Sequence, residues 1–417
     1  MIDHKKSHPA IRFRKAGVLT LILTLFFICI SATAQNSITG TVSDQTSILP
    51  VQDATVYINN TAIGTSTDLN GAFSLKNVTF PCKLIISRIG YELKTIDLAQ
   101  FTPEKQIILL KAKAVQLSAV EISAKNNRGK SVDKFKRYFL GSDSWSKQIK
   151  LENNAVLEFE SSTDTLQPDI ANNYFQQINE ENDTTKSKNS YNVFSVKAKA
   201  PIILDFPSFG YKLSVDLVNF NIVKTPKTSI CKYLAYYFYQ PYTSVSKTAE
   251  RRYQKNRLTA FSNSREHFTR MLFNDKLRKS GYLVVDCYID SATYEVEKKF
   301  FDINNHLVYK NDKEAQIIGL KGRTFYIFDF FNYNNKPYDL TNTKKFDFKS
   351  VDAFWKSSEK YRDNDLSIYN YKNSSITFTA DTCTIKNNGT ILDDNILFGG
   401  KMVQKKAAAM IPDIYIP

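Results

Sequence analysis

The stretch Ile63-Gly-Thr-Ser-Thr-Asp-Leu-Asn-Gly-Ala-Phe-Ser-Leu75 contains two turns and a short β-rich run. Ile63-Gly64 suits a tight turn, and Asp68-Leu-Asn-Gly71 places a glycine where a positive φ is easiest to adopt. The run Ala72-Phe-Ser-Leu75 follows directly. This combination of turns and a short strand predicts β-structure for this part of the chain.

The same pattern extends on both sides of this stretch. Between residues 37 and 111 the chain alternates short β-rich runs with turn residues, and no segment of helical period interrupts them. Regularly spaced short strands with turn signals between them are typical of an all-β sandwich. The other runs are Ile38–Val42, Ala54–Ile58, Leu84–Ser87 and Gln106–Leu110.

Four segments resemble, in this order, the carboxypeptidase regulatory-like domain. They are Ile38-Thr-Gly-Thr-Val-Ser-Asp44, Pro50-Val-Gln-Asp-Ala-Thr-Val-Tyr-Ile58, the stretch 63–75, and Ile85-Ile-Ser-Arg-Ile-Gly-Tyr91. The resemblance implies a transthyretin-like or Ig-like Greek-key sandwich of seven strands over residues 36–112. It also implies a domain that is usually non-catalytic and accompanies other domains in envelope proteins of Gram-negative bacteria.

The histidines argue against a zinc carboxypeptidase. Such an enzyme needs His and Glu ligands for zinc and a further carboxylate to activate water. Beyond residue 34 the histidines are His267 and His306, and neither belongs to a His-x-x-Glu pattern. We therefore expect no enzyme activity, no metal and no cofactor. The turn at 68–71 lacks the distal Glu and the flanking helices of a calcium loop. A hydrolase with an unrecognised active site remains the alternative.

The first 34 residues have the order of a secretory signal peptide. A basic stretch from Lys5 to Lys15 precedes the apolar run Val18–Ile30, and Ser31-Ala-Thr-Ala34 supplies an A-x-A cleavage pattern. The run has 13 residues, whereas a helix needs about 20 to cross a bilayer. Cys29 follows Ile28 rather than a small residue, which disfavours lipid attachment. We expect an exported protein of the periplasm, the outer membrane or the cell surface.

The net charge and the cysteine content do not identify a binding partner. Removal of residues 1–34 takes away five Lys or Arg and one acid, and leaves 51 basic and 40 acidic side chains, a net charge of +11. We interpret the basic residues as scattered surface charge and expect no nucleic-acid partner. The wide spacing of the remaining cysteines fits no zinc pattern, and their disulfide state stays open. They are Cys82, Cys231, Cys287 and Cys383.

Residues 113–130 are the predicted linker, because a short extended run ends in the polar, glycine-terminated Asn126-Asn-Arg-Gly129. The run resembles the connection that follows the same sandwich in TonB-dependent outer-membrane receptors. The remaining chain is too short for the 22-stranded barrel of such receptors, so the alternative is a small outer-membrane β-barrel related to their N-terminal extensions. The end Ile414-Tyr-Ile-Pro417 lacks the terminal aromatic residue typical of such barrels.

Residues 131–417 are predicted to form a larger antiparallel β-rich region with one or two helical insertions. One helix is expected near 131–140, where apolar residues share a face, and another near 247–279, with a capping box at Asn263-Ser-Arg-Glu266. Asn387-Asn-Gly389 predicts a hairpin between residues 382–386 and 390–393. Further strands are expected at Tyr211–Leu217, Tyr233–Tyr239, Leu283–Ile289, Thr293–Phe301, Thr324–Phe331 and Ser375–Thr379.

The polar cluster Arg265, Glu266, His267 and Arg270 is the constellation most similar to a catalytic site. His267 could act as a base and the arginines as an anion clamp. No nucleophile motif lies nearby, so we favour the start of a capped helix.

Two further patterns are weaker indications of a functional site. Glu158 and Glu160 lie on one face of a strand, but the sequence cannot place the second acid of a glycosidase across a cleft. Aromatic runs at 233–242 and 325–333 suit buried strands better than sugar stacking, which stays an alternative.

Segments of the second region resemble exported proteins that join this sandwich to an uncharacterised β-rich module. Among them are Ser264-Arg-Glu-His-Phe-Thr-Arg-Met-Leu272 and Phe398-Gly-Gly-Lys-Met402. We therefore expect a non-catalytic exported protein of the cell envelope. Its sandwich would be a docking or adhesion module, and its C-terminal region would bind an envelope protein or a glycan. Peripheral association with the outer membrane and the oligomeric state stay open.

Overall fold

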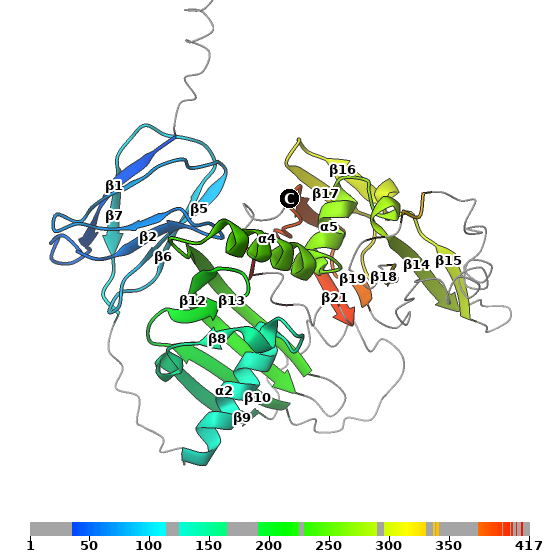
Figure 1. The fold of residues 1–417 in the computed structure, drawn as a ribbon, viewed down its shortest axis with the longest axis horizontal. Helices are drawn as coiled ribbons and strands as arrows, with labels where there is room; N and C mark the ends of the chain where they lie inside the picture. Colours follow the sequence, from blue (N-terminus) through cyan, green and yellow to red (C-terminus); the bar gives the residue numbers. More distant parts are fainter. Residues whose placement is uncertain are drawn as a thin grey trace, which may run out of the picture.

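The structure is a computed structural model. It describes residues 36–113, 125–164, 191–224, 229–289, 296–330, 337, 339–341, 374–393, 395–400, 402, 406, 410 and 411. The predicted signal peptide lies outside these residues. Figure 1 shows the strands in three groups, an N-terminal sandwich in blue and cyan, a central sheet in green, and a C-terminal group in yellow to red. The fold is mainly β, as predicted, and α4 lies between these groups (Figure 1).

The predicted sandwich is confirmed. Its seven strands form one sheet of order β4-β1-β7 and another of order β3-β2-β5-β6. β1 and β7 are parallel, and the other neighbours are antiparallel. Val42, Val56, Leu84 and Ile86 are fully buried between the sheets. The strands are β1 (Ile38–Asp44), β2 (Thr55–Ile58), β3 (Gly64–Ser66), β4 (Ala72–Leu75), β5 (Cys82–Ser87), β6 (Lys94–Leu98) and β7 (Gln106–Leu110).

The central sheet is organised around one long strand, β12, of 14 residues. β11 and β10 pair with successive halves of one edge of β12, β8 and β9 extend the sheet beyond them, and β13 pairs along the other edge. A bulge between Leu217 and Asn219 interrupts the register with β13. The strands are β8 (Lys150–Leu151), β9 (Leu157–Asp164), β10 (Tyr191–Ala198), β11 (Ile202–Phe206), β12 (Tyr211–Lys224) and β13 (Ser229–Pro241).

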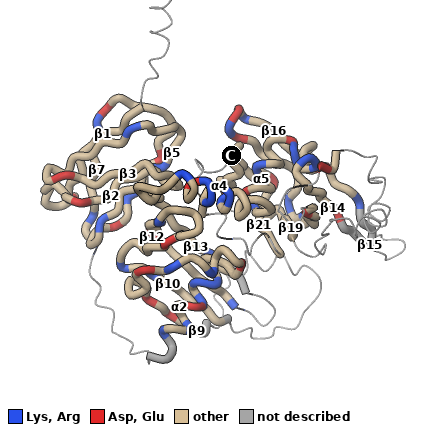
Figure 2. Tube along the Cα trace, viewed as in Figure 1, with Lys and Arg blue, Asp and Glu red and all other residues tan. Residues whose placement is uncertain are grey.

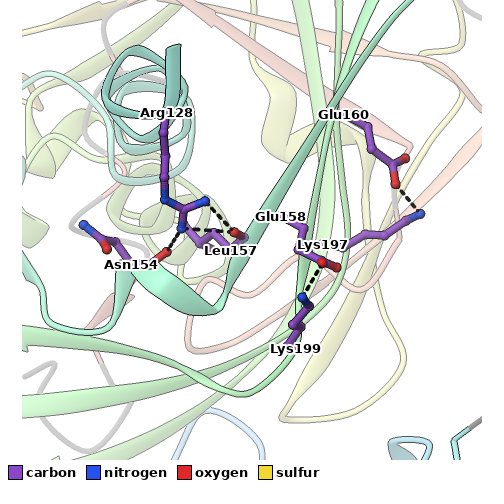
Figure 3. A network of polar contacts seen from close by, with 7 residues as sticks. All are labelled: Arg128, Asn154, Leu157, Glu158, Glu160, Lys197 and Lys199. Carbon is purple, nitrogen blue, oxygen red and sulfur yellow. Dashed lines mark hydrogen bonds and ion pairs between the residues drawn. The ribbon is translucent and has the colours of Figure 1, made fainter. Parts of the chain in front are cut away.

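Helix α2 (Lys125–Leu140) covers one face of the central sheet. Phe135 contacts the ring of Phe220 and Phe139 that of Tyr233, each with centroids 5.0 Å apart. The helix begins at Lys125, within the stretch predicted as linker, rather than near residue 131. Its early start has a tertiary cause, because Arg128 donates hydrogen bonds to the carbonyl oxygens of Asn154 and Leu157 (Figure 3).

The C-terminal group has a five-stranded sheet of order β15-β14-β18-β19-β21 and a three-stranded sheet of order β16-β17-β20. Their shared core includes Phe268, Tyr282, Phe325 and Ile385. The strands are β14 (Tyr282–Ile289), β15 (Val296–Phe300), β16 (Leu307–Tyr309), β17 (Glu314–Ile318), β18 (Thr324–Asp329), β19 (Ser374–Phe378), β20 (Thr382–Lys386) and β21 (Ile396–Gly400). Short 3-10 helices occupy Ser146–Gln148, Asn154–Val156, Arg278–Ser280 and Ile303–His306.

The helical segment predicted near 247–279 is divided into α4 (Lys247–Phe261) and α5 (Arg265–Phe273). The predicted capping box is displaced by one residue. Asn263 adopts a left-handed conformation with φ of 64°, so it joins the two helices, and Ser264 caps α5 by accepting from the backbone N–H of His267. The predicted Asn-Gly turn is present, since Lys386 donates to the carbonyl of Thr390, but the main partner of β20 is β17.

Candidate functional site

The sandwich docks on the outer face of the central sheet through a buried carboxylate. Asp216 on β12 accepts hydrogen bonds of 2.6 Å from the hydroxyls of Tyr57 on β2 and Ser87 on β5. Tyr57 and its cross-strand partner Ile85 are almost fully buried, yet neither belongs to the core of the sandwich. They point outward from the sandwich and are covered by the central sheet.

The electrostatics of this contact follow from burial. Asp216 retains 9% of its exposure, and burial raises its pKa above the ordinary value of 3.8. The hydrogen bonds from Ser87 and Tyr57 favour the charged form and act in the opposite direction. Burial and the neighbouring carboxylate also raise the pKa of Tyr57, so this phenol stays protonated and remains a donor.

The turn after β2 covers the free edge of β13. Asn60 donates its backbone N–H to the carbonyl of Tyr237, and Tyr239 donates to the carbonyl of Thr61, each at 3.0 Å. The amide N–H of Tyr237 also donates to the side chain of Asn59 at 2.9 Å. A strand edge with unpaired polar groups is thereby satisfied within the chain. We call all of these contacts, together with those of Asp216, the seam.

The seam also includes a contact between two aromatic rings. The rings of Tyr57 and Phe238 stack with centroids 5.1 Å apart. Gly64 on β3 lies directly against Phe238, and a Cβ there would stand 2.4 Å from that ring. The close approach therefore depends on a residue without a side chain.

A pocket of about 440 Å³ opens along the seam. The sandwich contributes residues 87–93, Thr95 and Lys113, and the central sheet contributes residues 198–201, 216–218 and Tyr236. Its lining therefore joins charged side chains with hydroxyl groups and two tyrosine rings. We call this the seam pocket.

The charges around the seam pocket are only partly balanced. Lys199 pairs with Glu158 at 2.6 Å, and Glu92 pairs with Lys111 at 2.9 Å. Asp216 is held by its two hydroxyl donors. Arg88 donates to the carbonyl of Asp53 at 3.2 Å and has no ion pair with an acid in the described part of the chain. The seam pocket can thus offer both donors and acceptors to a polar ligand.

The predicted cluster on α5 is brought together but its members are engaged in local contacts. Arg265 donates to Glu266 at 2.9 Å. Nδ1 of His267 lies 2.7 Å from the hydroxyl of Tyr282, and its ring meets that of Phe261 edge-on at 5.2 Å. The guanidinium of Arg270 lies 6.0 Å from the same phenylalanine ring. These contacts are those of a capped helix that packs on its neighbours.

The two glutamates considered for a glycosidase are each paired with a lysine. Glu160 binds Lys197 at 2.9 Å and Glu158 binds Lys199 at 2.6 Å across the β9 and β10 edge (Figure 3). Within the residues described, we find no group of three His, Cys, Asp or Glu side chains arranged to hold a metal ion. Asp68 accepts from the N–H groups of Asn70 and Ala72, as a turn requires.

Most of the described cysteines and aromatic side chains are buried or half-buried and have a structural role. Cys82, Cys231 and Cys383 are free thiols. Burial raises the pKa of Cys82 and of Cys231 to about 11 and that of Cys383 to about 12, so these thiols are unreactive at neutral pH. The side chain of Cys287 lies outside the described residues. Tyr239 and Phe325 are buried in cores, whereas Tyr236 lines the seam pocket. Phe331 and Tyr333 are not described.

Sequence reasoning missed the seam. Asp216 occupies a polar position of an alternating strand, a pattern that predicts solvent exposure. The signal that could have indicated it is the uninterrupted apolar run Leu84-Ile-Ile86, together with Val56-Tyr-Ile58, because such runs indicate strands covered on both faces. Neither run identifies the covering partner.

Comparisons with known proteins support the sandwich. Residues 38–122 match the family model of the CarboxypepD_reg-like domain, which confirms the resemblance for this part of the chain. No curated protein matches the chain. Among solved structures, the chain is similar to a Bacteroides fragilis protein of unknown function that was proposed to be membrane-associated. The identity is 10% and the TM-score 0.16, over 50% of this chain and 83% of that chain. A likeness with so low a TM-score supports neither a fold nor a function for this chain.

Proposed function

We propose that the protein is a non-catalytic component of the cell envelope that binds a glycan in the seam pocket. The observation that carries this proposal is the composite lining, because the sandwich and the central sheet each supply part of it. The docked sandwich is then a structural part of the binding site.

The chemistry of the lining favours a hydroxyl-rich ligand. Thr95 and Arg88 offer hydrogen-bond donors. Glu92 and the hydroxyl oxygen of Ser87, whose hydrogen is donated to Asp216, offer acceptors. Sugars combine many hydroxyl groups with flat apolar faces, and tyrosine rings such as Tyr236 suit those faces. Ligand pockets for apolar molecules carry few polar groups, unlike this one.

The seam also supports a binding role rather than catalysis. A raised pKa in a cleft is a property that catalytic acids share. For Asp216, burial beneath the docked sandwich accounts for the shift, and the contacts with Tyr57 and Ser87 account for its position. These donors fix the carboxylate as part of the interface.

Two observations support an envelope location. Residues 1–34 have the order of a secretory signal peptide. The match of residues 38–122 to the CarboxypepD_reg-like domain implies a module that accompanies other domains in envelope proteins. Among the residues that the structure describes, we find no helix with the length and hydrophobicity that a membrane span requires.

The proposal is tested by calorimetric titration of the mature chain with a panel of neutral and acidic envelope oligosaccharides. Ala200 lines the seam pocket, so Ala200→Trp should fill it and weaken binding at least about tenfold. Ser74→Trp is the matched control, because Ser74 is exposed on the other sheet of the sandwich. Equal binding by wild type and Ala200→Trp, or no binding of any oligosaccharide, would overturn the proposal.

A further inference from the structure

The exposed side of α4 carries a row of basic residues. Lys247, Arg251 and Lys255 follow one another at intervals of four, so they lie along one line of the helix, and Arg252 stands beside them. All four are exposed. Figure 2 shows the blue of Lys and Arg gathered along α4, between the sandwich and the C-terminal group. We call these four residues the basic row.

No acid among the described residues forms an ion pair with the basic row. Glu250 is the acid of α4, and it pairs with the buried Arg257 at 3.2 Å. The guanidinium of Arg252 lies 5.5 Å from the centroid of the Tyr253 ring.

The opposite side of α4 is fixed to the central sheet. Arg257 retains 2% of its exposure and donates from Nε and Nη2 to the carbonyl of Phe209. Tyr253 packs against Gly210, where a Cβ would stand 2.3 Å from its ring. These buried contacts fix the orientation of α4, so the basic row lies on its exposed side.

The shape of the basic row indicates an extended partner. A pocket at the N-terminus of α4 is lined by residues that include Ser246, Ala249 and Tyr253 and by none of the four basic residues. Leu258 continues the same line and is 47% exposed. The line from Lys247 to Leu258 is about 16 Å long at the rise of an α-helix. A convex row of cations that ends in an apolar side chain suits a surface better than a small anion.

We propose that the basic row binds a membrane surface that carries anionic headgroups, with Leu258 in contact with the acyl boundary. Clusters of Lys and Arg on a helix are attracted to anionic bilayers, and an adjacent apolar side chain adds insertion to this attraction. The net charge of +11 after removal of residues 1–34 acts in the same direction. The binding is independent of the seam pocket.

The test is co-sedimentation of the mature chain with vesicles of phosphatidylcholine alone or mixed with phosphatidylglycerol. Binding is expected with the anionic vesicles and should fall as salt rises. The variant K247Q/R251Q/R252Q/K255Q should bind at least tenfold more weakly. The control K76Q/K94Q/K105Q/K321Q removes the same charge from exposed positions elsewhere and should bind like the wild type. Circular dichroism checks that both variants fold.

Several outcomes would overturn the proposal. They are failure of the wild type to bind anionic vesicles, equal loss in both variants, and unchanged binding in the basic-row variant. Binding of soluble heparin without binding of vesicles would indicate a polyanion in place of a membrane. Leu258→Ser separates contact with acyl chains from charge, since it should weaken vesicle binding several-fold and leave heparin binding unchanged.

Discussion

The carboxylate of Asp216 accepts a 2.6 Å hydrogen bond from the hydroxyl of Tyr57, a residue 159 positions earlier in the chain. This contact joins the central sheet to the sandwich at a largely buried carboxylate on the border of the seam pocket. Because a buried carboxylate without donors would be costly, each part depends on the other for its local stability.

Removal of the Tyr57 hydroxyl should destabilise the chain. Tyr57→Phe keeps the ring that stacks on Phe238 but leaves one oxygen of Asp216 without its donor. We expect the free energy of unfolding in urea to fall by about 1–3 kcal/mol. Tyr326→Phe is the matched control, since that side chain is 39% exposed and should shift stability by at most about 0.5 kcal/mol. Equal effects of the two changes would contradict a role for the seam.

Stability should depend on pH through Asp216. Its pKa is raised above 3.8 in the folded chain, so the folded state holds this proton more tightly than the unfolded state. The resulting stabilisation is complete at low pH and is lost as pH rises from about 3.8 through the folded pKa. Asp216→Asn lacks this titration. The stability of wild type relative to the variant, from urea unfolding at several pH values, should therefore decrease across this window. An increase with pH would mean that the folded pKa is lowered.

The seam should not tolerate a methyl group at Gly64. Gly64→Ala would bring Cβ to within 2.4 Å of the Phe238 ring, and we expect a loss of about 1–3 kcal/mol in the free energy of unfolding. The same change in a Phe238→Ala background should cost much less. Gly129→Ala is the control, because nothing lies within 4 Å of a Cβ there and α2 should gain up to about 1 kcal/mol. An unchanged penalty in the double variant would place the strain elsewhere.

The turns and single strands of this fold follow from local sequence, and the contacts between its parts do not. The Asn-Gly turn before Thr390 and the strand at Ala72–Leu75 are determined by residues that are neighbours in the chain. Helix α2 begins earlier than its sequence indicates because Arg128 reaches the backbone of Asn154, a contact that no local pattern encodes.

The same distinction applies to the functional surfaces. Asp216 lies in a strand that reads as half exposed, and only the distant Tyr57 and Ser87 make its position a buried one. The basic row was accessible in principle, since Lys247, Arg251 and Lys255 have helical spacing. The sequence alone does not distinguish these residues from other surface lysines and arginines, because tertiary contacts such as that of Arg257 with Phe209 determine which side of α4 is exposed.

Anchoring of α4 should depend on Arg257. Arg257→Met would leave the carbonyl of Phe209 without its donor in a buried place, and we expect a loss of about 1–3 kcal/mol in the free energy of unfolding. Arg251→Gln on the exposed side of the same helix should change it by at most about 0.5 kcal/mol. Thermal unfolding of both variants gives the comparison, and similar shifts would show that Arg257 does not anchor the helix.

Amide hydrogen exchange at Asn60 and Tyr239 in the full mature chain reports most directly on whether the sandwich is fixed to the central sheet. Each of these N–H groups donates across the seam, to Tyr237 and Thr61 respectively. If the seam is formed, both should exchange as slowly as amides inside the β12 and β13 ladder. Exchange of both at the rate of an unstructured peptide, while amides within β5 and β12 stay protected, would contradict the docked arrangement.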